Sequence, residues 1–221
     1  MLISIAIDGP IGVGKSTTAR KTAELLGFTY IDTGAMYRAA ALYLLEKGLN
    51  IHSETVVSQA LPDIVISLSH VNGEQRVFLG ERDVSEVIRT QEVAEAASIV
   101  ASYTCVREKL VAVQKQMAKS GNVVMDGRDI GSKVLPNAQV KIYLDASLEV
   151  RTQRRADDLK NRGKNVDFEE VKCDIMVRDE RDMTRFDSPL VCVNGADKID
   201  TSYMTIEEVA ERIAELARMV M

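Results

Sequence analysis

The residues 9–16, GPIGVGKS, constrain the fold of this chain more than any other stretch. They match the pattern G-x-x-x-x-G-K-[ST], in which backbone N–H groups and a helix N-terminus face phosphate oxygens. The flanks agree with this pattern. Residues 2–8 are an apolar, β-branched run typical of a buried parallel strand, and residues 17–26 are good helix formers that end before Gly27. The strand, loop and helix together predict a phosphate-binding loop in an α/β domain.

Two side chains of this phosphate loop (residues 9–16) have roles that the pattern itself assigns. Lys15 brings positive charge to the β- and γ-phosphates of a nucleotide, and the Ser16 hydroxyl can ligate Mg²⁺. The alternative is a chance glycine turn before an ordinary helix, which would not need the Lys-Ser pair or the preceding strand. The residues expected to contact a nucleoside triphosphate are Gly9, Pro10, Ile11, Gly12, Val13, Gly14, Lys15, Ser16 and Thr17.

Length and composition limit the class of protein. A chain of 221 residues fits a single α/β domain over residues 1–221, and 46% hydrophobic residues can fill its core. The net charge of −5 gives no overall attraction to nucleic acid or anionic membranes. The three cysteines are widely spaced, and no run reaches the ~18 apolar residues of a membrane span. We expect a cytoplasmic monomer that acts on small molecules, without nucleic-acid or membrane partners.

The pattern changes between about residues 49 and 89. Segments 64–68 and 76–79 alternate like half-buried strands, and Asn72-Gly73 between them is a strong signal for a tight hairpin. Parallel strands are instead joined by long crossover connections. We therefore expect residues 49–89 to form a small inserted lobe with an antiparallel hairpin.

An apolar strand expected at residues 122–125 is followed directly by Asp126-Gly127-Arg128-Asp129. In open α/β sheets ligands bind beyond the carboxyl ends of the strands, so two acids and an arginine at this edge indicate a functional site. The alternative is an ordinary Asp-Gly turn with solvated neighbours. The other expected elements are strands at 28–32, 140–144 and 198–200, and helices at 35–47, 90–101, 104–119 and from Thr205, which forms a capping box with Glu208.

Arginines are concentrated between residues 151 and 185. A helix expected at 147–162 ends near Gly163, and Asp167 can cap the next one. The second helix carries three charged residues at i, i+4 and i+7, which predicts that they share one face: Arg178, Asp182 and Arg185. These residues indicate a helical lid over bound phosphates. A solvated, salt-bridged helical pair is the alternative.

A phosphate loop alone marks a nucleotide binder and does not select a reaction. The N-K-x-D motif by which GTPases read the base is absent, and two histidines without a Ser-His-Asp set do not favour histidine catalysis. Phosphoryl transfer needs a metal, a lysine and several arginines around one point, which this chain supplies. We therefore expect a small kinase. A nucleotide-gated binding protein, or a kinase for another small molecule, is the alternative.

Five blocks in this order and spacing closely resemble bacterial cytidylate kinases: IAIDGPIGVGKST, YIDTGAMYRA, DVSEVIRTQEV, MDGRDIG and RDERDMTR. The resemblance covers nearly the whole chain. It implies ATP and Mg²⁺ as cofactors and CMP or dCMP as phosphoryl acceptor. The fold it implies is a phosphate-loop kinase core with a parallel sheet flanked by helices, an inserted monophosphate-binding lobe (about 49–89) and a helical lid (about 151–185).

The resemblance also implies roles for single residues. Arg38 and Arg128 would hold the acceptor phosphate, and Asp126 is the acid expected near Mg²⁺ together with Ser16. The residues expected in catalysis are Lys15, Arg128, Arg154 and Arg178. The residues expected to line the cytosine pocket are Thr33, Ser98, Arg107 and Asp129, and those expected to approach substrate from the lid are Arg178, Asp182 and Arg185. Thr33 stands where serine would be equally expected, and residues 191–196 match no motif.

Overall fold

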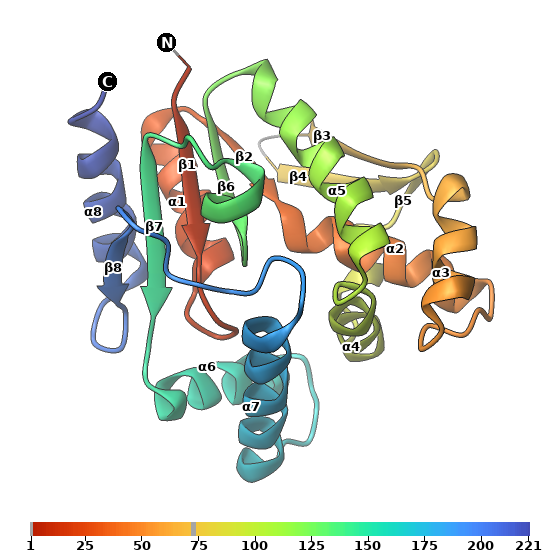
Figure 1. The fold of residues 1–221 in the computed structure, drawn as a ribbon. Coiled ribbons are helices and arrows are strands. Elements are labelled where there is room, and N and C mark those ends of the chain that lie inside the picture. The colour runs from red at the N-terminus through yellow and green to blue at the C-terminus, as the bar shows by residue number, and fades with distance from the viewer. Residues whose placement is uncertain (1, 72–73) are drawn as a thin grey trace. The chain divides into compact units, whose positions relative to one another are not determined.

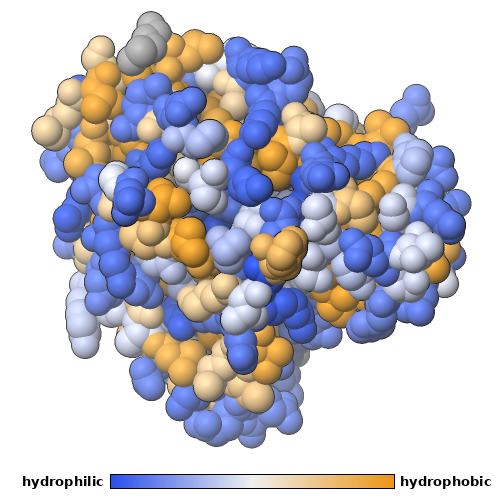
Figure 2. All heavy atoms as spheres, viewed as in Figure 1, coloured by the Kyte–Doolittle hydropathy of each residue, from blue (hydrophilic) through white to orange (hydrophobic). Residues whose placement is uncertain are grey.

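The computed structural model describes residues 2–71 and 74–221, and the chain divides into two compact units (Figure 1). We call Met1–Tyr30 together with Gly121–Met221 the phosphate-loop unit, and Ile31–Ser120 the inserted unit. The described residues include no helix that combines the length and apolar character needed to span a membrane. On the face drawn in Figure 2, hydrophobic residues lie in several separate groups among hydrophilic ones.

The phosphate loop follows the central strand, β1, of a five-stranded sheet. Its order is β2-β6-β1-β7-β8, and β1 pairs in parallel with β6 and β7, as β7 does with β8. In register, Asp8 of β1 lies between Gly127 of β6 and Tyr143 of β7, so the loops that follow β1 and β6 leave the sheet at one edge. The strands are β1 (Ser4–Asp8), β2 (Thr29–Asp32), β6 (Val123–Gly127), β7 (Val140–Asp145) and β8 (Asp197–Asp200).

The helices of the phosphate-loop unit are α1 (Lys15–Leu26), α6 (Leu148–Asn161), α7 (Phe168–Thr184) and α8 (Ile206–Arg218). The helices α1 and α8 lie side by side, with Val209 and Ile213 buried in the core beside Ile5 and Ile7 of β1 (Figure 1). The predicted capping box of Thr205 with Glu208 is confirmed at the start of α8. The strand β6 is followed by a short π-helix, Ile130–Val134, which the sequence pattern did not predict.

The inserted unit contains α2 (Thr33–Glu46), α3 (Glu54–Ala60), α4 (Gln91–Val100) and α5 (Thr104–Met117) with a three-stranded sheet, β3 (Ile66–Val71), β4 (Glu74–Leu79) and β5 (Arg82–Asp83). The strands β3 and β4 pair antiparallel, which confirms the predicted pairing, although β3 begins two residues later than expected. The predicted Asn72-Gly73 turn lies outside the described residues. Helix α3 was missed, although Ser53 caps it by accepting the Val56 N–H.

A single hydrophobic core explains why this unit is larger than residues 49–89. Met36 and Leu44 of α2 pack in one hydrophobic cluster with three other residues. These are Val77 of β4, Leu110 of α5, and Val84, which follows β5. All five side chains are buried. The helices before and after residues 49–89 are therefore integral to the same compact unit.

Candidate nucleotide site

At two positions of the phosphate loop, the backbone conformation and the close neighbours leave room only for glycine. A Cβ at Gly9 would lie 2.2 Å from the carbonyl oxygen of Leu144, which is far inside contact distance. Gly12 has φ +83°, and a Cβ there would lie 3.0 Å from the Cβ of Arg151. The loop is thus held in left-handed turns and packs closely against β7 and α6.

Lys15, the first residue of α1, is buried within the loop. Its Nζ donates a hydrogen bond of 2.6 Å to the carbonyl oxygen of Pro10. Burial lowers the pKa of Lys15 well below its ordinary value, and the positive charge of Arg128 acts in the same direction. The carboxylates of Asp126 and Asp182 oppose this shift. An anionic ligand at the loop would therefore supply the negative charge that favours the protonated lysine.

Ser16 and Asp126, the two predicted metal ligands, are brought together. The Ser16 Oγ donates a 2.8 Å hydrogen bond to Oδ2 of Asp126, whose Oδ1 accepts a 2.9 Å bond from the Tyr30 hydroxyl. Ser16 is exposed and Asp126 is buried. Hydroxyl and carboxylate oxygens are ligands that Mg²⁺ prefers, with phosphate and water completing its shell. Among the described residues no group of three His, Cys, Asp or Glu could hold a metal ion without such help.

Asp8 is a functional candidate that sequence reasoning missed. Its two carboxylate oxygens accept the backbone N–H groups of Ile130 at 2.8 Å and Gly131 at 2.7 Å, at the start of the π-helix. Burial raises the pKa of Asp8 to about 6, although both hydrogen bonds act to lower it. Asp8 therefore joins the end of β1 to the segment that carries Asp129. The only signal in the sequence was an acid directly before Gly9.

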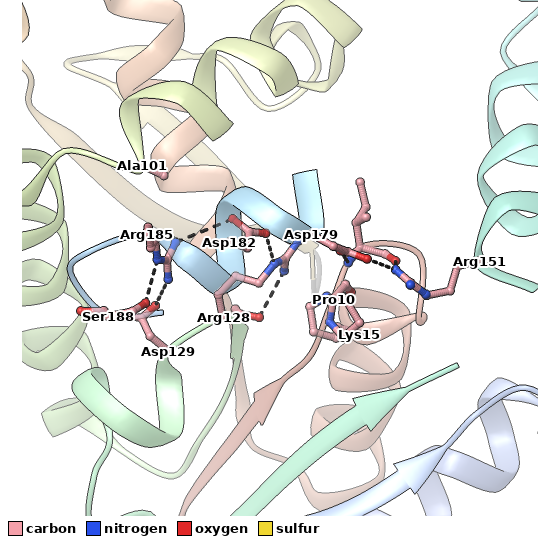
Figure 3. A network of polar contacts seen from close by, with 12 residues as sticks. Pro10, Lys15, Ala101, Arg128, Asp129, Arg151, Asp179, Asp182, Arg185 and Ser188 are labelled. Carbon is pink, nitrogen blue, oxygen red and sulfur yellow. Dashed lines mark hydrogen bonds and ion pairs between the residues drawn. The ribbon is translucent and has the colours of Figure 1, made fainter. Parts of the chain in front are cut away.

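A network of alternating charges connects the segment after β6 with α7 (Figure 3). The Nε of Arg128 donates a 2.7 Å hydrogen bond to Oδ2 of Asp182. The other oxygen of Asp182 lies 3.8 Å from Nη1 of Arg185, whose Nη2 lies 3.7 Å from Oδ1 of Asp129. All of these residues were predicted from the sequence as site residues, and the structure brings them into contact.

The C-terminal end of α7 differs in detail from the prediction. The helix ends at Thr184, so Arg185 is outside it, with extended backbone angles. Its side chain nevertheless reaches Asp182, because the chain turns directly after the helix. Burial acts to raise the pKa of Asp182, but the guanidinium groups of Arg128, Arg178 and Arg185 outweigh burial and hold the pKa below its ordinary value. Three arginines therefore keep this carboxylate ionised.

Arg154 of α6 has different partners. Its guanidinium donates to the hydroxyl of Thr201 at 3.0 Å and to the carbonyl oxygen of Thr201 at 2.6 Å. The Thr201 hydroxyl also lies 3.2 Å from the carbonyl oxygen of Val13 in the phosphate loop. These contacts link Arg154 to the phosphate loop through the segment that follows β8.

In the inserted unit, Thr33 and Arg38 lie on α2. The Nη2 of Arg38 donates a 2.9 Å hydrogen bond to Oδ2 of Asp32, whose other oxygen caps the helix by accepting the Ala35 N–H at 2.9 Å. Thr33 is the first residue of the helix and is buried. The same acid thus shapes the helix start and orients the arginine.

Ser98 of α4 and Arg107 of α5 are both buried in the inserted unit. Arg107 is only 2% exposed. Its Nη1 donates to the carbonyl oxygen of Ala101 at 3.2 Å, and its guanidinium carbon lies 5.7 Å from the centre of the Tyr37 ring. A guanidinium that has lost its water in this way interacts strongly with any polar group that reaches it.

The model of one protein family, described as cytidylate kinase, matches residues 5–219. The chain belongs to the cytidylate kinase family. It is 50% identical over 218 residues to a cytidylate kinase of Caldanaerobacter subterraneus subsp. tengcongensis, covering 99% of this chain and 96% of the relative. A cytidylate kinase of Shouchella clausii is 46% identical over 215 residues, covering 97% and 96%. The expected resemblance to cytidylate kinases is therefore confirmed.

The fold is also found outside the cytidylate kinases. The solved structure of a gluconokinase from Sinorhizobium meliloti 1021 aligns with 99% of this chain and 93% of its own, with a TM-score of 0.50. At 14% sequence identity this likeness concerns the fold alone. It supports the predicted parallel sheet flanked by helices.

Proposed function

We propose that this protein transfers the γ-phosphoryl group of ATP to CMP or dCMP, giving ADP and CDP or dCDP. The observation that carries the proposal is the convergence, in one unit, of the phosphate loop with Lys15, the Ser16–Asp126 pair and the Arg128–Asp182 pair. Phosphoryl transfer depends mainly on alignment and on neutralising charge, and these groups suit both tasks. The printed name of the two relatives, cytidylate kinase, supports the choice of acceptor.

On the donor side, ATP binds with its phosphates against the backbone of residues 9–17. Lys15 releases its hydrogen bond to the Pro10 carbonyl oxygen and binds the transferring phosphate instead. Ser16 and Asp126 would hold Mg²⁺, which would supply positive charge to the phosphates of ATP. Arg154, Arg178 and Arg128 add positive charge, so that no single group carries the whole task of stabilisation.

On the acceptor side, Arg38 and Arg128 bind the phosphate of CMP. Cytosine presents an amino donor beside two acceptors, so an acid, a hydroxyl and an arginine are a suitable set to read it. The residues proposed for the base are Thr33, Ser98, Arg107 and Asp129, and those proposed to act as the lid moves are Arg178, Asp182 and Arg185.

As further parts of the proposal, the lid spans about residues 151–185 and the monophosphate-binding lobe spans about residues 49–89. The enzyme is a cytoplasmic monomer without nucleic-acid or membrane partners.

The test is a phosphotransfer assay with ATP, Mg²⁺ and each of CMP, dCMP, UMP, AMP and GMP. We expect ADP to form fastest with CMP or dCMP, together with the matching diphosphate. ADP formation that does not depend on any acceptor, or ATP binding without turnover, would instead indicate a nucleotide-gated binding protein. Preference for a sugar or another small hydroxyl compound would contradict the proposed acceptor.

A further inference from the structure

A buried ion pair lies beside the phosphate loop and has no role in the function proposed above. It joins Arg151 of α6 to Asp179 of α7 (Figure 3). The two residues are only 9% and 7% exposed. Taking two charges out of water costs free energy that the pair must recover through close geometry and further hydrogen bonds. The partners of these further hydrogen bonds therefore indicate what the pair does.

Both polar backbone groups of Ile11 are among those partners. Oδ1 of Asp179 accepts the Ile11 N–H at 3.2 Å, and Nη1 of Arg151 donates to the Ile11 carbonyl oxygen at 3.1 Å. The Nε of Arg151 donates to the carbonyl oxygen of Ala146 at 3.1 Å, which fixes the guanidinium to the end of β7. The backbone of Gly12 then packs against Arg151 so closely that a Cβ would lie 3.1 Å from the Arg151 carbonyl oxygen.

This arrangement matters because a loop with three glycines has little stiffness of its own. A phosphate site is effective when its N–H groups already point at the ligand, since ordering the loop on binding would reduce affinity. The acid Asp179 also lies one turn before Asp182, which holds Arg128. One face of α7 therefore contacts both the phosphate loop and an arginine proposed to bind the acceptor phosphate.

We propose that Arg151 and Asp179 are positioning residues for ATP, which keep Ile11 and Gly12 in the conformation that receives phosphate. The inference rests on the proposed function only in taking ATP as the ligand of the loop. The inference predicts the direction in which the affinity for ATP changes when Asp179 is replaced. Removing a negative charge near bound phosphates would by itself tighten ATP binding, whereas loss of positioning weakens it.

The experiment measures ATP binding by calorimetry with Mg²⁺ and without acceptor, in variants of Asp179 and in a matched control. Asp179→Ala removes both contacts of the carboxylate, and we expect the Kd for ATP to rise at least tenfold. Asp179→Asn keeps an acceptor for the Ile11 N–H, so its Kd should rise less. The control Asp158→Asn removes a partly exposed acid of α6 that pairs with Arg155 and Arg162, and it should bind ATP as the wild type does.

Kinetics separate positioning from a general loss of structure. In Asp179→Asn the KM for ATP should rise, while the KM for CMP and the kcat at saturating ATP stay within about twofold. If Asp179→Ala does not fold, Arg151→Lys decides, because it keeps the charge but loses the forked donor geometry, and it should also weaken ATP binding.

Unchanged or tighter ATP binding in folded Asp179 variants would overturn the inference, as would equal rises in both KM values. The two proposals fail separately. A wild type that binds ATP but phosphorylates no nucleotide contradicts the proposed function alone. Active wild type together with normal ATP binding by Asp179→Ala contradicts the positioning role alone.

Discussion

The Nε of Arg128 and Oδ2 of Asp182 lie 2.7 Å apart, and this contact joins the segment after β6 to helix α7. Burial acts to lower the pKa of Arg128, but the carboxylates of Asp182, Asp179 and Asp126 together outweigh burial and raise it, with Asp182 contributing most. Asp182 is in turn held ionised by its arginine neighbours. Each residue therefore favours the charged form of the other.

Asp182→Asn should lower the free energy of unfolding near pH 7, by up to about 3–5 kcal/mol, because Arg128 stays buried without its carboxylate partner. The pKa of Asp182 in the folded protein lies below its ordinary value of about 4. Its stabilising effect is thus complete above pH 4 and is lost as the pH falls through the lower pKa of the folded state. Urea unfolding of both proteins between pH 7 and pH 3 measures this difference.

The difference in stability between wild type and Asp182→Asn should shrink toward acid pH. Asp174→Asn, which removes an exposed acid of the same helix, should unfold like the wild type at every pH. A difference that stays constant down to pH 3 would contradict the role given to the ionised carboxylate.

Lys15→Ala should leave a folded protein whose kcat is lower by on the order of 10²–10³. The lysine makes one hydrogen bond to the loop, so its loss removes positive charge from the transferring phosphate rather than core packing. Thermal unfolding and kcat at saturating ATP are measured on the same samples. Lys21→Ala, on the exposed side of α1, is the control. A near-normal kcat in Lys15→Ala would contradict the catalytic role of this residue.

Local chain geometry explains which features could be predicted from the sequence. The phosphate loop, the pairing of β3 with β4 and the cap at Thr205 all depend on residues close together in the chain, whose pattern determines their backbone. The Asp126–Asp129 block was found because parallel strands present their carboxyl ends at one edge. The resemblance to cytidylate kinases, and no local pattern, singled out Ser98 and Arg107, which are both buried in the inserted unit.

Contacts between distant segments explain what could not be predicted. The carboxylate of Asp8 binds N–H groups more than 120 residues away in the chain, and no local pattern marks these partners. Asp179 is one of several acids on α7, and only the packing of α6 and α7 distinguishes it from the exposed ones. The start of the π-helix also lacks a local signal, because its first two N–H groups bind Asp8 and Asp129 makes no side-chain cap.

Hydrogen exchange should identify the proposed lid at residues 151–185. These residues form α6 and α7, and Gly163 between them has φ +74°, which gives the chain a turn that other residues adopt with strain. We expect faster exchange in this segment without ligand than with an ATP–CMP bisubstrate analogue, since closure over phosphates excludes water. The difference should be largest around Gly163 and smallest at Arg151 and Asp179, which contact the phosphate loop without ligand. The core strand β1 is the internal control. Equal protection in both states would contradict a lid.

The choice of base should depend on Arg107 and Asp129, and not on Arg38. A phosphate contact contains no information about the base, so Arg38→Ala should weaken CMP and UMP equally. Arg107 and Asp129 are 2% and 5% exposed. In the proposed site, their removal would leave a cytosine polar group unpaired in a dehydrated setting. Such a loss costs about 1–3 kcal/mol, or roughly tenfold to a hundredfold in kcat/KM.

The loss should affect CMP and dCMP more than UMP, because the O4 of uracil accepts a hydrogen bond where the N4 of cytosine donates one. The kcat/KM values for CMP and UMP are therefore compared in Arg107→Ala, Asp129→Ala and Arg38→Ala. Oδ1 of Asp129 also lies 3.7 Å from Nη2 of Arg185. Asp129→Asn is therefore included, to separate the loss of this charge from the loss of a hydrogen-bond acceptor. If Arg38→Ala changes the ratio of CMP to UMP more than the other variants do, the assignments of phosphate and base contacts are reversed.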